Sequence, residues 1–259
     1  MAKSDLQISL VQTDIVWENA AANRKLLSEK FASLKGKQQI IILPETFTTG
    51  FSMQAEKLAE KMDGETAQWM KEESIKNRCI IAGSLIIEEQ GQYFNRMLWV
   101  MPNGDMAHYD KRHLFSYAGE DAAFSAGQKR MIVQVNGWKI CVQICYDLRF
   151  PVWARNTDDY DMLLYIANWP EKRNYVWENL LMARAIENMS FVIGVNRVGI
   201  DDNGHQYIGN SSIYSPLGEL IAKETEQEAV ITHTFQYSDI IESRQRFPFL
   251  SDRDDFLLR

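Results

Sequence analysis

The chain has 259 residues, 46% hydrophobic and 24% charged, which is typical of a globular protein and not of a disordered or fibrous one. Its formal net charge is −7 and it has no basic run or basic–aromatic stripe, which argues against nucleic acid as a partner. The sequence begins without the long apolar region of a signal peptide, and no segment approaches the roughly 18 uninterrupted apolar residues of a membrane span. Three cysteines are an odd number for a disulfide framework, so we expect a protein of the reducing cytoplasm.

Helical and strand patterns alternate along the whole chain. In chain order we predict a strand at 6–12, a helix at 17–34, a strand at 39–43, a helix at 65–77, strands at 79–88, 92–101, 107–110, 139–144 and 161–167, a helix at 175–188, and strands at 191–196, 209–214, 219–223 and 229–234. No linker, repeat or low-complexity tract divides this pattern. The alternation of helices and strands predicts one α/β domain over 1–259, with mixed strand pairing and sheets covered by helices. We expect its core at about 5–235 and a C-terminal tail at 236–259.

Cys145 ends an apolar strand and is followed by a polar, turn-prone segment. Asn136-Gly137 between alternating apolar residues predicts a tight hairpin, whose second strand runs to Ile144. The chain must then turn sharply near Asp147, and Pro151 is suited to open a helix. A thiol at such a junction lies near helix-end N–H groups, which is a workable position for a nucleophile.

A cysteine nucleophile needs a neighbouring group that activates it. A cysteine–histidine pair is the commoner arrangement, and the chain offers His108, His113, His205 and His233. Two charged residues also follow predicted strands, Glu45 after 39–43 and Lys111 after 107–110. Because strand ends of open α/β sheets meet at one edge, we expect Cys145, Glu45 and Lys111 to lie together. Cys141 and Cys145 lack a second cysteine pair or closely spaced histidines, so we expect no zinc site.

Six segments resemble the signature blocks of the nitrilase (carbon–nitrogen hydrolase) superfamily, in the same order. They are Leu43-Pro-Glu45-Thr-Phe47, Lys111-Arg-His-Leu-Phe115 with Gly119-Glu120, Cys145-Tyr-Asp-Leu-Arg-Phe-Pro151, Ala167-Asn-Trp-Pro170, Ala183-Arg-Ala-Ile-Glu-Asn188 and Asn196-Arg-Val-Gly199. Within the superfamily the chain most resembles the short bacterial omega-amidases of the YafV type. The resemblance implies a four-layer α-β-β-α sandwich that forms a homodimer, with the helix at 175–188 as a plausible contact.

The resemblance also implies a role for each site residue: Cys145 as nucleophile, Glu45 as general base, Lys111 as the cation near the developing oxyanion, and Glu120 as a second glutamate that positions the substrate amide or assists the base. A thiol is mostly protonated at neutral pH and needs such a base. The Lys111 ammonium and the Tyr146 N–H would stabilise the negative charge that forms on the amide oxygen. This thioester route requires no metal and no organic cofactor.

The implied reaction is hydrolysis of the terminal amide of 2-oxoglutaramate or 2-oxosuccinamate to the dicarboxylate and ammonia. The far carboxylate favours an arginine, whose fork matches it bidentately, so Arg173 is our candidate, with His113 second. The predicted apolar walls are Phe47, Phe115, Tyr146 and Trp169. The alternatives are an N-carbamoyl hydrolase, an aliphatic amidase or a nitrilase and, more remotely, a non-catalytic small-molecule binder.

Each candidate also has an ordinary structural interpretation. Cys145 fits a small core residue, as do Cys79 and Cys141. Glu45 fits a cap of the turn at Phe47, and Lys111 fits a solvated pair with Arg112. Glu120 fits an exposed acid beside Asp121, and Arg173 fits a solvated loop. Arg149 and Glu187 fit a structural ion pair or scaffold groups.

Overall fold

The structure is a computed structural model that describes residues 4–34, 36 and 38–257. Its strands are β1 (Leu6–Gln12), β2 (Ile40–Ile42), β3 (Ile80–Glu89), β4 (Gln92–Val100), β5 (Met106–Asp110), β6 (Met131–Val135), β7 (Trp138–Ile144), β8 (Met162–Ala167), β9 (Phe191–Asn196), β10 (Val198–Ile200), β11 (Gln206–Tyr214), β12 (Leu220–Thr225) and β13 (Ala229–Phe235). The α-helices are α1 (Ala20–Ser33), α2 (Ala55–Leu58), α3 (Glu65–Asn77), α4 (Glu120–Ala123), α5 (Pro151–Ala154), α6 (Asn174–Asn188) and α7 (Tyr237–Arg246). Short 3-10 turns are η1 (Ser116–Ala118), η2 (Cys145–Arg149), η3 (Glu171–Arg173) and η4 (Phe249–Asp252).

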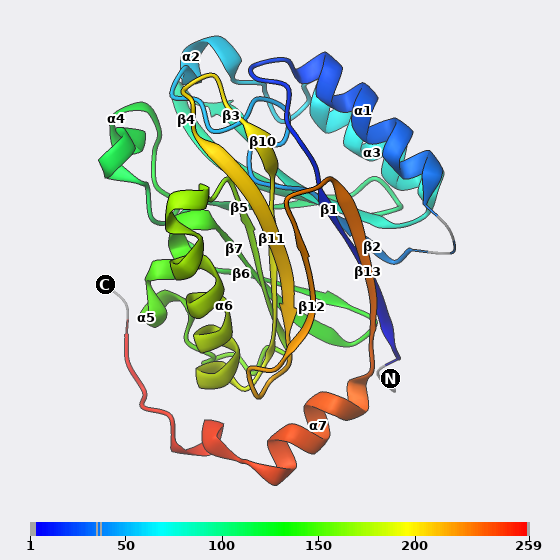
Figure 1. Cartoon of the computed structure of the whole chain (residues 1–259), viewed down its shortest axis with the longest axis vertical. Helices are drawn as coiled ribbons and strands as arrows, with labels where there is room; N and C mark the ends of the chain where they lie inside the picture. Colours follow the sequence, from blue (N-terminus) through cyan, green and yellow to red (C-terminus); the bar gives the residue numbers. More distant parts are fainter. Residues whose placement is uncertain (1–3, 35, 37, 258–259) are drawn as a thin grey trace.

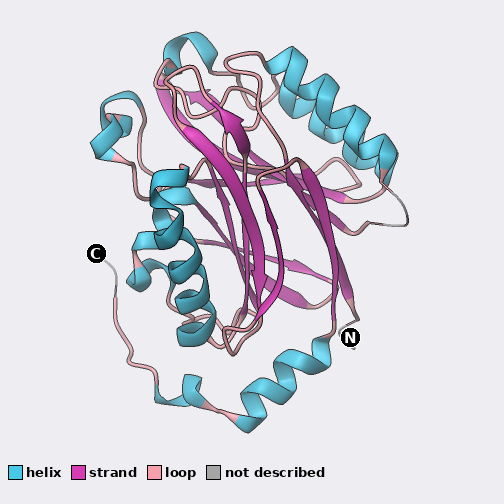
Figure 2. Cartoon of the chain, viewed as in Figure 1, coloured by secondary structure: helices cyan, strands magenta, loops and turns pink. Residues whose placement is uncertain are grey.

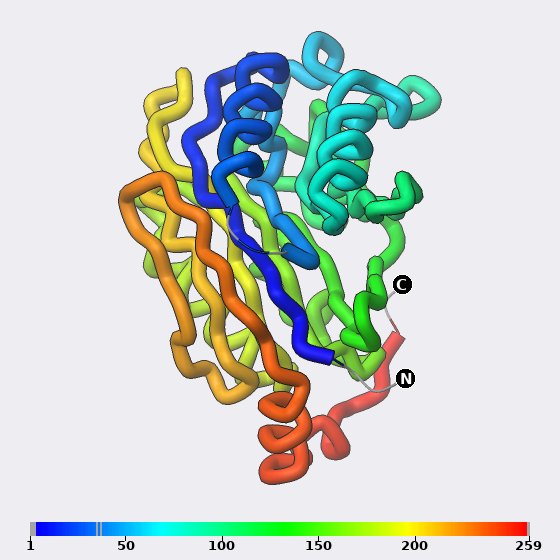
Figure 3. The backbone as a smooth tube through the Cα atoms, turned by 90° about the vertical axis from the view of Figure 1, so that its right-hand side faces the viewer, coloured from blue at the N-terminus to red at the C-terminus, as the bar shows by residue number. Residues whose placement is uncertain are grey.

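The described strands form two mixed sheets. One has the order β13-β1-β2-β3-β4-β5, and the other has the order β10-β11-β9-β8-β7-β6 with β12 paired to β11. Strands β1, β2 and β3 run parallel, as do β7, β8 and β9, while the hairpins at the sheet edges are antiparallel. Helices α1 and α3 cover one side, α5 and α6 cover the other, and the strands lie between them (Figures 1 and 2). The tube view shows α1 and α3 side by side on their sheet (Figure 3). The predicted four-layer α-β-β-α sandwich is therefore confirmed.

Successive side chains of a strand point alternately into the core between the sheets and into a core under the helices, which explains the layers. Ile40 and Ile42 of β2 join the core between the sheets, whereas Ile41 joins the core under α1 and α3. In β7, Ile140 packs between the sheets and Cys141 packs under α6. Because successive side chains of a strand point to opposite faces, a strand covered on both sides is apolar throughout.

The predicted elements are mostly confirmed, and β1, α3 and β9 begin and end as predicted. The helix expected from Trp17 begins at Ala20, because Asn19 caps it by accepting from the Ala22 N–H. We did not predict α2, α4, β10 or α7, which are short or largely polar. No described helix has both the length and the apolar character needed to cross a membrane.

The hairpin before Cys145 and the turn after it have the conformations that the sequence predicts. Asn136 and Gly137 have φ of 49° and 86°, the positive values that a tight two-residue hairpin turn requires. Cys145 follows β7 with φ of 44°, which is uncommon for a residue with a side chain, and begins η2. Pro151 is at the first turn of α5, as predicted. Cys145 is thus the residue at which β7 gives way to the helical segments η2 and α5.

Candidate active site

Four predicted side chains meet at one edge of the sandwich although they come from different elements. Glu45 follows β2, Lys111 follows β5, Glu120 begins α4 and Cys145 follows β7. The first three belong to the half of the chain that builds the first sheet, and Cys145 belongs to the second sheet. The site therefore lies where the two sheets face each other.

Lys111 is fully buried between two carboxylates. Its Nζ lies 2.8 Å from Glu45 Oε1 and 2.9 Å from Glu120 Oε1. Burial alone would lower the pKa of Lys111, but the charges of Glu120 and Glu45 outweigh it and raise this pKa above its usual value. The ammonium therefore stays charged at neutral pH, and because Lys111 is buried, the solvated pair with Arg112 is excluded.

Glu45 is fully buried and held by neutral donors as well as by Lys111. The Asn95 side chain on β4 donates to its Oε1 at 2.8 Å, and the Asn168 N–H donates to its Oε2 at 2.8 Å. The loop that carries Glu45 continues beside β3, where the Leu43 N–H donates to the Ala82 carbonyl at 2.7 Å. The carboxylate is thus fixed on both of its oxygens.

Glu120 is also fully buried, contrary to the interpretation as an exposed loop acid. Its Oε2 accepts from the Phe115 N–H at 2.5 Å. Burial raises the pKa of Glu120, the Lys111 charge opposes this, and the Glu45 charge adds to it. Glu120 therefore ties the Phe115 segment to the Lys111 ammonium through its two carboxylate oxygens.

Cys145 is partly exposed toward a pocket, unlike Cys79 and Cys141, which are buried. The charges that act on its thiol come from Glu45, Lys111 and Glu120. Burial, followed by the negative charge of Glu45, raises the pKa of this thiol well above its usual value, while Lys111 acts in the opposite direction. The resting form of Cys145 is therefore the thiol and not the thiolate.

The turn at Cys145 is anchored by Asp147. Asp147 Oδ2 accepts from the Ile144 N–H at 3.0 Å and from the Tyr109 hydroxyl at 2.7 Å. Its Oδ1 accepts from the His113 N–H at 2.9 Å and lies 2.8 Å from His113 Nδ1. Since His113 also stacks on Phe150 with ring centroids 3.6 Å apart, it supports the turn and lies outside the pocket lining. The structure thus places His113, our second candidate for carboxylate binding, in a scaffold position.

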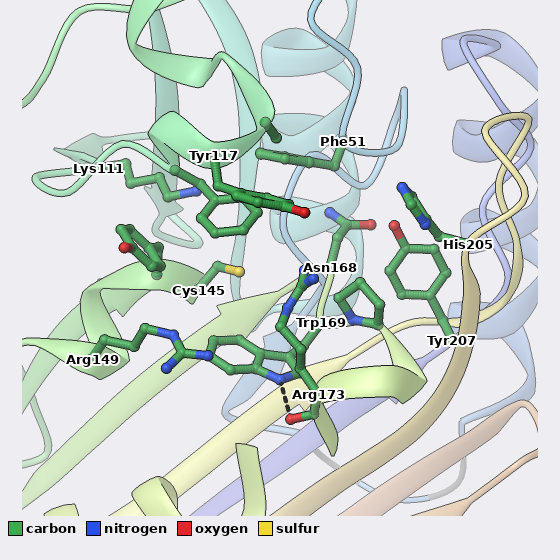
Figure 4. Close-up of a pocket in the computed structure, with 14 residues that line it drawn as sticks. Phe51, Lys111, Tyr117, Cys145, Arg149, Asn168, Trp169, Arg173, His205 and Tyr207 are labelled. Atoms are coloured by element: carbon green, nitrogen blue, oxygen red, sulfur yellow. Dashed lines mark hydrogen bonds between the residues drawn. The ribbon is translucent and has the colours of Figure 1, made fainter. Parts of the chain in front are cut away.

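A cavity of about 240 Å³ opens beside Cys145. Its lining is mainly aromatic and cationic: Phe51, Lys111, Phe115, Tyr117, Ala118, Cys145, Tyr146, Arg149, Asn168, Trp169, Pro170, Arg173, His205 and Tyr207. Figure 4 shows Cys145 between Lys111 on one side and Arg149 and Arg173 on the other. Four of the predicted substrate-contacting residues, Phe115, Tyr146, Trp169 and Arg173, line this cavity. Phe47 does not: it is buried in the core under α1 and α3, where its ring lies 5.9 Å from that of Trp69.

Two guanidinium groups of the pocket have no acidic partner among the described residues. Arg149 lies over the Trp169 ring at 5.3 Å, and Arg173 lies over the Phe115 ring at 5.1 Å. Of our two interpretations of Arg149 and Glu187, the ion pair between them is wrong, because Glu187 pairs with Arg184 at 3.0 Å, which fits the scaffold role for Glu187. With Lys111 neutralised by two carboxylates, these two arginines give the pocket an excess of positive charge suited to an anionic ligand.

Sequence reasoning missed several lining residues, chiefly Phe51, Tyr117, Arg149, His205 and Tyr207. Arg149 lies in the segment that resembles the nucleophile block, so its position four residues after Cys145 was the available signal. Tyr207 and His205 come from the β10–β11 hairpin, and no spacing links this hairpin to Cys145. Among the described residues Cys145 has no histidine partner. Within residues 4–34, 36 and 38–257, no group of three His, Cys, Asp or Glu side chains is placed to hold a metal ion.

Comparison with known proteins agrees with this geometry. Residues 7–245 match the sequence profile described as carbon-nitrogen hydrolase. The chain is 44% identical to the omega-amidase YafV of Yersinia enterocolitica, over 98% of this chain and 99% of the relative. It is 32% identical to the 2-oxoglutaramate amidase of Bacillus subtilis, over 95% and 96%. The crystal structure of XC1258 from Xanthomonas campestris, described as a CN-hydrolase superfamily protein with an arsenic adduct in the active site, superposes with a TM-score of 0.96, at 43% identity and with 98% and 99% of the two chains covered.

Proposed function

Because this chain belongs to the carbon–nitrogen hydrolase family, we propose that it is an omega-amidase that hydrolyses the terminal amide of 2-oxoglutaramate or 2-oxosuccinamate to the dicarboxylate and ammonia. Relatives named omega-amidase and 2-oxoglutaramate amidase support this assignment. The observation that carries it is the buried Lys111, 2.8 Å from Glu45 and 2.9 Å from Glu120, beside a thiol that opens to a cationic pocket.

The first half of the reaction forms a thioester. Glu45 takes the proton of the Cys145 thiol as the sulfur attacks the amide carbon, so a free thiolate is never needed. Negative charge moves to the amide oxygen, where the Lys111 ammonium and the Tyr146 N–H stabilise it. The Tyr146 N–H is among the first of η2, and such groups have no partner within their own helix. When the carbon–nitrogen bond breaks, Glu45 returns the proton to nitrogen and ammonia leaves.

The second half hydrolyses the thioester. Glu45, again a carboxylate, takes a proton from water as the water oxygen attacks the thioester carbon. The carbon–sulfur bond breaks, the proton passes from Glu45 to Cys145, and the dicarboxylate leaves. Lys111 stabilises the oxyanion of both halves and keeps its own proton throughout, in keeping with its raised pKa. Glu120 holds Lys111 and the Phe115 segment in place.

The pocket charges support a substrate with a carboxylate at the end far from the amide. Arg173 and Arg149 face the cavity without acidic partners, and each guanidinium offers a planar fork for a carboxylate. The aromatic rings of Phe115, Tyr146 and Trp169 enclose the short carbon chain between amide and carboxylate. An uncharged aliphatic amide or a nitrile would leave both guanidinium groups unpaired inside the cavity.

The test is ammonia release from a panel of substrates by the wild type and by Cys145→Ala. We expect the oxo-acid omega-amides to be cleaved with the highest kcat/KM, ahead of N-carbamoyl compounds, aliphatic amides and nitriles, and we expect no turnover by the variant. A higher kcat/KM for one of the other classes would replace the substrate assignment. Absence of turnover on the whole panel would favour a non-catalytic binder.

We also propose that the chain acts as a single domain and forms a homodimer through the outer face of α6. Exposed apolar side chains gather there from α6, from the neighbouring turn and from the start of β12, namely Met182, Ile186, Leu217 and Leu220. The solution mass should be twice the 30.0 kDa of the chain, and Ile186→Glu should reduce it to one chain. Ile75→Glu, on the exposed face of α3, is the matched control that should leave the dimer intact.

The cytoplasm is the compartment that we propose, because turnover requires a reduced Cys145 and all three cysteines are free thiols. Cell fractionation followed by detection of the protein tests this proposal. Recovery of the protein from an oxidising compartment would contradict it.

A further inference from the structure

Asn168 follows β8 and makes four contacts with Glu45 and Thr46. Its N–H donates to Glu45 Oε2 at 2.8 Å, and its side-chain Nδ2 donates to the Glu45 main-chain carbonyl at 2.7 Å and to Thr46 Oγ1 at 3.0 Å. The same Nδ2 lies 3.5 Å from Glu45 Oε2. Asn168 is 4% exposed and lines the pocket with Cys145 and Lys111.

The orientation of the Asn168 amide follows from its partners. The Glu45 main-chain carbonyl and the Glu45 carboxylate only accept hydrogen bonds, so the NH2 group must face them. Asn168 Oδ1 then points the other way and has no donor among the described residues. An unpaired buried oxygen is unfavourable, so stability alone does not explain an amide at this position.

The backbone that Asn168 holds is strained. Thr46 has φ of 40°, a genuine outlier for a β-branched residue, which persists only where the surroundings fix it. Ser84 Oγ accepts from the Thr46 N–H at 2.7 Å, and the Asn168 amide contacts the Glu45 carbonyl and Thr46 Oγ1. The Thr46 carbonyl also accepts from the Thr49 and Gly50 N–H groups at 3.0 and 2.8 Å, so the Asn168 amide is the side-chain contact that ties this turn to the second sheet.

Asn168 also connects the two halves of the site. Strands β7 and β8 are paired in parallel with Ile144 opposite Ile166, so Cys145 and Asn168 lie at neighbouring strand ends of one sheet. Glu45 belongs to the other sheet. A contact from Asn168 to Glu45 therefore fixes the base relative to the sulfur that it must deprotonate.

We propose that Asn168 is a positioning residue whose side-chain amide aligns the Glu45 carboxylate with Cys145 Sγ. This inference rests on the proposed amidase function, in which Glu45 is the base. The charged and titratable groups around Glu45 are Lys111 after β5, Glu120 of α4, Cys145 of η2 and Tyr207 of β11. The amides of Asn95 and Asn168 are the neutral donors.

Asn168→Asp is the main test, because it replaces the donor with a carboxylate of the same shape. The added negative charge favours the protonated form of Glu45, so the acid limb of the profile of kcat against pH should move up by about one pH unit. Misalignment of Glu45 should also lower kcat at neutral pH by about tenfold or more with KM nearly unchanged. Asn168→Ser removes the amide without adding charge, so it should lower kcat and leave the acid limb in place.

Asn196→Asp is the matched control. Asn196 ends β9, is 1% exposed, and donates to the Trp169 and Gly209 carbonyls without contacting Glu45. It should lower Tm without moving the acid limb. If both Asn168 variants lower Tm while kcat of the folded enzyme and the acid limb stay at wild-type values, Asn168 is structural only and the proposal fails.

A second readout needs no substrate. The rate of Cys145 alkylation by iodoacetamide depends on deprotonation by Glu45, so its pH dependence should move upward in Asn168→Asp and not in Asn196→Asp. If the wild type releases no ammonia from any omega-amide, the proposed function fails, and this alkylation profile still decides the role of Asn168. An unmoved profile in Asn168→Asp overturns the positioning role.

Discussion

Lys111 Nζ and Glu45 Oε1 form an ion pair 2.8 Å long in which neither side chain has any exposed surface. The pair is therefore a fixed part of the core and is not screened by solvent. Because Glu120 lies on the same ammonium at 2.9 Å, removal of the cation would leave two buried carboxylates next to each other.

Lys111→Met should abolish turnover and strongly destabilise the fold. Loss of one partner of a buried ion pair typically costs about 3–5 kcal/mol in the free energy of unfolding, which urea denaturation measures. Lys57→Met is the control, because Lys57 pairs with Glu18 at the surface and its loss should change the free energy by about 1 kcal/mol or less. Equal losses of unfolding free energy in the two variants would contradict the prediction that the buried Lys111 ammonium is essential for stability.

Glu120→Gln should change how stability depends on pH. Burial raises the pKa of Glu120 above its ordinary value of 4.5, so the folded state holds this proton more tightly than the unfolded state does. As pH rises above about 4.5, ionisation of Glu120 therefore lowers the stability of the wild type but not of the variant. The free energy of unfolding of Glu120→Gln relative to wild type should increase with pH across this window. Asp121→Asn, at an exposed position, should show a much smaller trend, and equal trends would contradict the effect of burial.

Cys145→Gly should be more stable than Cys145→Ala, although both lack activity. Cys145 has φ of 44°, a value that glycine adopts without strain and alanine does not, so the difference should be about 1 kcal/mol. Cys141 in the middle of β7 is the control with the opposite sign, because glycine there weakens the strand relative to alanine by about 0.5–1 kcal/mol. Urea denaturation of the four variants measures both differences. A Cys145→Gly variant less stable than Cys145→Ala would show that the turn is not strained.

Iodoacetamide should modify one thiol of the native protein at neutral pH. Burial raises the pKa of Cys79 to about 11 and that of Cys141 to about 11, and both are inaccessible. Cys145 faces the pocket, and Glu45, the base that we propose, acts on its thiol. Peptide mapping should place the label on Cys145, substrate should protect it, and Glu45→Gln should slow the labelling. Equal labelling of Cys79 would argue against an activated nucleophile.

Arg149→Ala and Arg173→Ala should each raise KM for an oxo-acid amide more than for an uncharged amide. Loss of a charge-assisted hydrogen bond of about 1.5–3 kcal/mol corresponds to roughly a tenfold to hundredfold weaker binding. Lys172→Ala, at an exposed neighbouring position, is the control and should change neither KM. The same increase on both substrate types would remove that arginine from carboxylate recognition.

The sequence predicted the fold, and the proximity of Glu45, Lys111 and Cys145, because both depend on local patterns. The apolar runs of β2 and β7 mark strands covered on both faces, and Asn136-Gly137 fixes the hairpin before Cys145. Glu45, Lys111 and Cys145 were found at strand ends by the rule that such ends converge, and the resemblance added Glu120.

The remaining pocket depends on packing between segments far apart in the chain. From the sequence we expected His113 and Phe47 in the pocket. Instead Asp147 hydrogen-bonds His113, and Phe47 packs against Trp69 in the core. Tyr207 reaches the pocket from the β10–β11 hairpin, where its hydroxyl donates to Asp201. No local spacing encodes which of these rings faces the cavity.

The residues of the site are divided between the sheets, with Glu45 and Lys111 on one and Cys145 and Asn168 on the other. Neither half of the molecule can carry out the chemistry alone, even when its own strands are fully formed. During refolding, recovery of turnover should therefore lag behind the far-ultraviolet circular dichroism signal, since catalysis begins only when the two halves dock.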